Sequence, residues 1–175
     1  MADPTKVSQK TRITDPQLSD ILYIVINPAS VPQGGYVELS YLKELILVDH
    51  KTRYAEIPVF APGQEWATGD GKAYLHIPPE FDGMNLVYVH GRVITAGTTG
   101  TGDVQIYNVT NSVDMLSTKL TIDSGETGSE DAAADAVIDT NNDEVSENDL
   151  LRIDVDAKHT TAAKGLIITL GFQTP

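Results

Sequence analysis

Two runs of alternating apolar and polar residues give the clearest pattern in the chain, at positions 150–157 and 166–172. Their apolar members are Leu151, Ile153, Val155, Ala157, Leu166, Ile168, Leu170 and Phe172. Alternation with period two is typical of strands that bury one face. The polar connection 158–164 is short enough for a hairpin, so we expect the two strands to pair with each other.

Shorter strand patterns fill most of the chain from position 61 to position 150. They predict strands at 73–77, 86–95, 103–108, 115–122 and 136–138, separated by turns rich in Gly, Asn and Asp. Many short strands with almost no helical period are typical of an all-β protein. We therefore predict a jelly-roll-like antiparallel β-sandwich over 57–175. A parallel α/β sheet is excluded because the connections lack helices.

The strand predicted at 86–95 differs on its two faces. One face holds Val87, Val89, Gly91 and Val93, and the other holds Tyr88, His90, Arg92 and Ile94. The second face mixes aromatic, charged and aliphatic side chains, whereas a plainly solvated face would be uniformly polar. We expect Tyr88, His90 and Arg92 to lie in a contact between subunits.

The first 56 residues follow a different pattern. Positions 1–14 are polar and without periodicity, which suits either a frayed terminus or an extended arm that orders on a partner. Positions 15–56 predict a β-hairpin and a short helix. Such a unit cannot support itself in water, so it must dock on the following domain, on identical copies or on another protein. The residues expected to attach it are Leu22, Tyr23, Ile24, Val25, Tyr36, Val37, Leu42 and Leu45.

Two prolines, Pro58 and Pro62, favour an extended linker or an edge strand at the start of the second part. The domain boundary is expected near Glu56.

Charge divides the chain in the same way. The net charge is -13, and positions 61–175 hold eighteen Asp and Glu residues against six Lys and Arg. A surface this acidic repels phosphate backbones, so nucleic acid is not an expected partner. The absence of cysteine removes disulfides and thiolate ligands. No apolar run approaches the length of a membrane span, and the polar start does not resemble a secretory signal.

Candidate chemistry is sparse, and we expect neither an enzyme nor a bound cofactor. Asp139, Asn141 and Asp143 have the spacing that opens a calcium loop, but Glu144 replaces its glycine and the closing carboxylate is missing. An Asx-rich turn is favoured, and a weak calcium site stays open. His76 and His90 could share a zinc ion with an Asp or Glu, but histidines on a polar face or in an interface are favoured, and these could instead donate to neighbouring carboxylates.

Exposed aromatic rings could recognise sugars by stacking. Trp66, Tyr74 and Tyr88 are the candidates for contact with a glycan, and the alternative is a place in the core or in a subunit contact. The triplet Asn108-Val109-Thr110 matches a glycosylation acceptor, but without a secretory signal we treat it as chance.

Two stretches resemble proteins of tailed-bacteriophage particles. Leu18, Asp20, Leu22, Tyr23, Ile24, Val25, Pro28, Gly35, Val37, Leu39 and Leu42 resemble a short module near the N-termini of phage fibre proteins. The runs GDGKAYLHIPPEFDGMNLVYV (69–89), TAGTTGTGDVQIYNV (95–109), VDMLSTKLTIDSGET (113–127) and LLRIDVDA (150–157) resemble a β-sandwich domain of phage structural proteins.

These resemblances imply a non-enzymatic virion surface protein, assembled in the host cytoplasm. The N-terminal segment would anchor it to a major capsid protein or another virion protein. The sandwich would project as a homotrimer, in a capsid decoration (cement) protein or a short head or tail fibre. The alternative is a receptor-binding module for host cell-surface carbohydrate.

Overall fold

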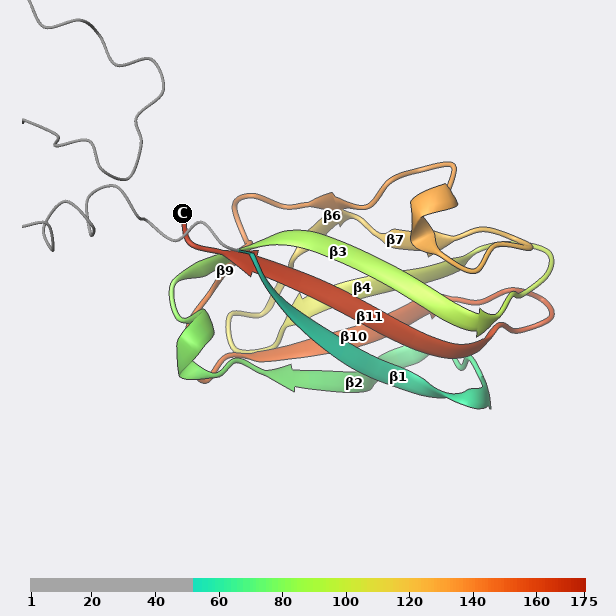
Figure 1. Ribbon diagram of the computed structural model, residues 1–175, viewed down its shortest axis with the longest axis horizontal. Coiled ribbons are helices and arrows are strands. Elements are labelled where there is room, and N and C mark those ends of the chain that lie inside the picture. The colour runs from blue at the N-terminus through green and yellow to red at the C-terminus, as the bar shows by residue number, and fades with distance from the viewer. Residues whose placement is uncertain (1–51) are drawn as a thin grey trace, which may run out of the picture. The chain divides into compact units, whose positions relative to one another are not determined.

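The computed structural model describes residues 52–175, and these form a two-layer antiparallel β-sandwich (Figure 1). Two single-turn 3-10 helices, η2 (Pro79–Phe81) and η3 (Ser129–Asp131), interrupt the strands. The strands are β1 (Arg53–Glu65), β2 (Gly69–His76), β3 (Met84–Thr95), β4 (Gly102–Asn108), β5 (Val113–Asp114), β6 (Leu116–Thr118), β7 (Leu120–Ile122), β8 (Val137–Ile138), β9 (Glu144–Val145), β10 (Leu150–Ala157) and β11 (Lys164–Gln173).

The strand order is that of a jelly roll, as predicted. Sheet A runs β1-β11-β3-β9 and sheet B runs β2-β10-β4-β5, with β7 also paired to β4 and a small β6-β8 ribbon beside them. From β1 to β4 consecutive strands alternate between the sheets, β10 returns to lie between β2 and β4, and the last strand lies beside the first. Two interleaved Greek keys produce this order. In Figure 1, sheet A lies in front of sheet B.

The predicted hairpin of the last two strands is wrong, although their alternation is correct. β10 lies in sheet B between β2 and β4, whereas β11 lies in sheet A between β1 and β3. The connection crosses from one layer to the other, and its own His159 and Ala163 are buried. Loop length permitted pairing, but each strand makes more contact by joining two neighbours in its own sheet.

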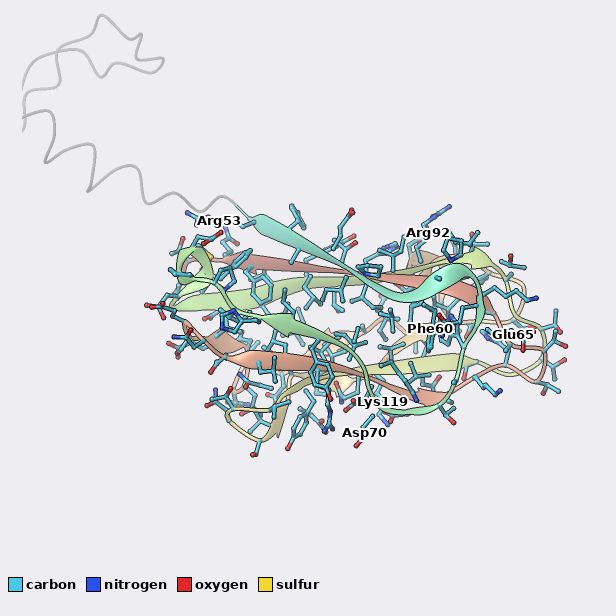
Figure 2. The ribbon with its side chains drawn as sticks, turned by 90° about the horizontal axis from the view of Figure 1, so that it is seen from below. Arg53, Phe60, Glu65, Asp70, Arg92 and Lys119 are labelled. Carbon is cyan, nitrogen blue, oxygen red and sulfur yellow. The ribbon has the colours of Figure 1, made fainter. Side chains whose placement is uncertain are left out.

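The core is the space between the sheets. Leu151, Ile153 and Val155 line it from sheet B, and the alternating residues of β11 line it from sheet A: Leu166, Ile168, Leu170 and Phe172, all fully buried. Figure 2 shows the sandwich from its edge, with Phe60 between the layers.

The face assignment for β3 holds from Tyr88 onward and fails at Val87. Tyr88 pairs with Gly171 but Leu86 pairs with Phe172, so Val87 is an extra residue on β3. Because of this β-bulge, the core-facing positions of β3 are odd-numbered from Val89 onward, whereas the even-numbered Leu86 faces the core before the bulge. Val87, expected inside, is therefore 44% exposed, whereas Leu86 is 1% exposed.

Two other boundaries also differ from expectation. The strand predicted at 115–122 divides into β6, which pairs with β8, and β7, which pairs with β4. Exposed polar residues at 117–119 separate them, and the adjacent Met115 and Leu116 are both buried, which a single alternation cannot achieve because neighbouring side chains point to opposite faces. The boundary near Glu56 falls inside β1, which pairs with β11 from Arg53 onward.

The sandwich has two distinct ends. Arg53 pairs with Phe172, so the chain enters β1 at the end where β11 finishes. Glu65 pairs with Lys164 at the other end, where the connections β1–β2, β3–β4 and β10–β11 lie. Figure 2 shows Arg53 and Glu65 at these two ends. The predicted arm (1–14) and most of the predicted attachment module lie outside the described residues.

Candidate functional site

The outer face of sheet A is formed by side chains of β1, β11 and β3 that point away from sheet B. Its rows follow from the pairing: Tyr54–Gly171–Tyr88, Glu56–Thr169–His90 and Pro58–Ile167–Arg92. Tyr88, His90 and Arg92 therefore share one face, as the alternation predicted. We call this surface the outer face of sheet A below.

Gly171 allows the two tyrosines to close over the central strand. A Cβ at this position would lie 2.9 Å from Tyr54 and 2.9 Å from Tyr88, so a larger residue would push the rings apart. The rings meet edge to face with their centroids 5.7 Å apart, and the Tyr88 ring stacks on that of His90. An aromatic strip thus crosses the face near the end where the chain enters.

The segment around η3 fastens the other side of β3. Gly91 N–H donates to Ser129 Oγ at 3.0 Å, and Val93 N–H donates to the Thr127 carbonyl at 2.9 Å. Glu130 lies 2.6 Å from His90 Nε2 and accepts from Arg92 at 3.2 Å. A hydrogen bond from its own backbone N–H, with further help from His90, lowers the pKa of the Glu130 carboxyl.

Exposed apolar side chains gather on the strands of this face. Eight large apolar residues are exposed within 52–175, and five belong to β1, β3 and β11: Tyr54, Val87, Tyr88, Ile94 and Ile167. The tyrosines share one row, and Ile167 lies two rows further on, beyond the row Glu56–Thr169–His90. Scattered single exposures need no explanation, but several on one sheet mark a surface suited to contact.

The outer face of sheet B is held by a polar network instead. Arg152 donates to Asp154 at 2.7 Å and to Asp70 at 3.2 Å, and its guanidinium lies over the Tyr107 ring, 4.5 Å from the centroid. The hydrogen bond to Asp154 raises the pKa of Arg152. Lys119 is 2.8 Å from Asp156, and this contact raises the pKa of the lysine. These charged groups therefore pair with one another on the outer face of sheet B. Asp70 and Lys119 lie on this side in Figure 2, opposite Arg92.

Trp66 cannot present its ring to a sugar. It is 1% exposed and packs between Phe60 and His159, with the ring centroids 6.3 Å and 6.2 Å apart. Tyr74 and Tyr88 are exposed, but they lie on opposite sheets. The three predicted glycan-contact residues therefore do not form one platform, and the core alternative holds for Trp66.

The turn at 139–142 behaves as an Asx turn. Asp139 accepts from the backbone N–H of Asn141 at 3.1 Å and from the side-chain amides of Asn141 and Asn142. The backbone N–H of Asn141 is the main cause of a lowered pKa at Asp139. Within residues 52–175, no three His, Asp or Glu side chains are placed to hold a metal ion together.

The remaining candidates separate in space. His76 ends β2 in sheet B, whereas His90 lies in sheet A and pairs with Glu130, so the two do not share a site. Asn108 is 1% exposed and donates to Asp149 at 3.0 Å, which makes its triplet a structural element of the core edge.

Sequence reasoning missed three contributors to the outer face of sheet A. Tyr54 and Ile167 were recoverable in principle, because they are the outward members of strands whose inward members are strongly apolar. Glu130 was not, because it reaches β3 from a segment 38 residues away in the chain. The predicted attachment residues Leu22, Tyr23, Ile24, Val25, Tyr36, Val37, Leu42 and Leu45 lie outside the described residues.

Comparison with models of protein families, with curated proteins and with solved structures finds no match. Among residues 52–175, no helix is both long enough and apolar enough to cross a membrane.

Proposed function

We propose that the chain is a non-enzymatic structural protein on the surface of a tailed-phage particle. Its N-terminal segment anchors it to a capsid or other virion protein, and its sandwich projects as a homotrimer. It serves as a capsid decoration (cement) protein or as a short head or tail fibre. The sequence resemblances are the reason for proposing a phage particle. The geometry of the sandwich is a physical argument for anchoring at one end and projection of the other.

The polarity of the sandwich carries the proposal. The chain enters at Arg53, and three loops gather at the far end around Trp66, Gly97 and His159. If a particle holds the segment before Arg53, the end of the sandwich that carries the three loops points away from the particle into solvent. Its acidic surface suits this position, because net charge keeps crowded projecting domains apart and soluble.

Binding to particles tests the proposal. Purified full-length chain is incubated with phage particles that lack it, and the particles are pelleted and imaged with an antibody to the sandwich. We expect label on the outer surface of the particles. The variant Leu22→Asp is expected to abolish binding, because it places a charge in the apolar segment proposed to dock.

The control for that variant is Val137→Asp, at an apolar position of β8 that is 49% exposed. Both variants must keep the melting temperature of the sandwich. Binding that survives Leu22→Asp, or that is lost equally in both variants, would remove the anchoring role.

One observation favours the carbohydrate alternative, namely the exposed Tyr54–Tyr88 pair, since paired aromatic rings can stack on sugars. Glycan binding that is lost in Tyr88→Ala and kept in Tyr74→Ala would favour a receptor-binding role for this face. Silence on a broad glycan array would favour the structural role.

A further inference from the structure

We infer that the outer face of sheet A is the surface through which copies of this chain contact one another. The inference rests on the proposed function, which requires self-association, and it adds the place where this occurs. The partner to which it commits is a second copy of the same chain.

Apolar exposure supplies the first argument. Tyr54, Tyr88, Ile94 and Ile167 are between 36% and 60% exposed and lie on three adjacent strands. Fixed aromatic side chains at the centre of a contact bury large areas at little cost in conformational entropy. Tyr54 and Tyr88 are already held against each other over Gly171, so little further ordering is needed on association.

Charge identifies the partner. Residues 52–175 hold seven Lys and Arg and nineteen Asp and Glu. The outer face of sheet A and its Glu130 hold one base and two acids, namely Arg92 with Glu56 and Glu130. The six bases and seventeen acids elsewhere in residues 52–175 therefore carry a net charge of -11, against -1 for the face. Two copies would repel each other through those other surfaces, whereas this face, which carries only a small part of the negative charge, meets its own copy with little repulsion.

The small net charge of the outer face of sheet A also argues against a basic partner there. A positively charged protein would be drawn to the acidic surfaces, such as the segment 120–151, which contains no Lys or Arg. A nearly neutral surface gains little from a charged partner and suits a partner with the same mixture of apolar and charged side chains.

Strand edges are poorer routes to association than the face. β3 is covered along 91–93 by the segment that includes Thr127 and Ser129. β1 carries Pro58 and Pro62, which have no N–H to offer an incoming strand. Joining two sheets edge to edge is therefore hindered on both sides of sheet A.

The experiment measures the dissociation constant of the full-length chain by sedimentation equilibrium over a range of concentrations. Ile94→Glu and Tyr88→Glu alter the outer face of sheet A. Tyr74→Glu is the matched control, because Tyr74 is 54% exposed on sheet B and Ile94 is 55% exposed on sheet A. Circular dichroism and thermal melting establish that each variant is folded. Tyr88→Ala adds a milder change if Tyr88→Glu does not fold.

We expect the wild-type chain and Tyr74→Glu to self-associate with similar constants. Ile94→Glu and Tyr88→Glu should weaken association by at least about tenfold, as expected for loss of a central contact. A persistently monomeric wild-type chain would overturn the inference, as would undiminished association of folded Ile94→Glu and Tyr88→Glu. Particle binding, tested separately through Leu22→Asp, would then decide whether the proposed function survives.

Discussion

His159 shows how position overrides the chemistry of a residue. Its imidazole is fully buried against Trp66, and neither ring nitrogen has a partner in the described part of the chain; the Trp66 indole N–H is likewise unpaired. Burial of a polar group without a hydrogen bond costs free energy. Gly97 lies directly beneath the ring, since a Cβ there would overlap it. The residue therefore acts as a space-filling ring at the loop end of the sandwich.

Replacing His159 with an apolar residue should not harm the fold. We predict that His159→Leu leaves the melting temperature unchanged or raises it, because the unpaired nitrogens disappear while most of the volume stays. Gly97→Ala should lower the free energy of unfolding by about 1–3 kcal/mol, because the methyl group enters space occupied by the imidazole. Gly63→Ala is the control, as nothing lies within 4 Å of its Cβ. Chemical denaturation measures all three, and a large loss in His159→Leu would show that the imidazole makes polar contacts.

Asp139 gives the fold a dependence on pH. Its pKa is lowered in the folded chain, so its contribution to stability is present above the ordinary carboxyl pKa of about 4 and is lost as pH falls through the lowered value. We predict that wild type is more stable than Asp139→Asn at pH 7 and that the difference shrinks below pH ~4. Urea denaturation across this pH range measures it. A stability difference that is constant with pH would show that the substitution acts through the shape of the side chain and not through its charge.

Alternation identified the inward residues of β10, β11 and most of β3 from the sequence. It could not identify neighbours, because one strand pattern fits either a hairpin or two opposed sheets. In the structure the two strands lie in opposite sheets, because each can then bury its apolar face in the core and pair with two neighbours. The bulge at Val87 could not be predicted from the sequence either, since it is defined by the register of β3 against Phe172 and Gly171 of β11. The outer face of sheet A was predicted in part, from Tyr88, His90 and Arg92. Its β1 and β11 members and Glu130 depend on which strands meet.

The placement of β10 makes an energetic prediction. Val155 is fully buried, whereas Val109, which follows β4, is 36% exposed. We predict that Val155→Ala lowers the free energy of unfolding by about 2 kcal/mol, from two lost carbon atoms and the space they leave. Val109→Ala should cost less than half as much. Guanidinium denaturation monitored by circular dichroism checks this, and equal losses would contradict the placement of Val155 in the core.

At the scale of the molecule, the sandwich is asymmetric in two directions. Along its length, one end receives the chain and the other carries the loops around Trp66 and His159. Across its thickness, the outer face of sheet A carries little net charge and several exposed apolar side chains, whereas the Arg152 network lies on sheet B. The first asymmetry supports attachment at one end, and the second supports association through one face. Both are the premises of our proposal that the domain stands beside copies of itself on a larger surface.

Site-specific photo-crosslinking of the full-length chain tests this account most directly. The photoreactive residue p-benzoylphenylalanine is introduced as Tyr88→p-benzoylphenylalanine on sheet A, or at Tyr74 on sheet B as the matched control. The account predicts crosslinked multimers from position 88, with the attached peptide mapping to β1, β3 or β11 of a second copy, and little product from position 74. Multimers from position 74 with none from position 88 would contradict it.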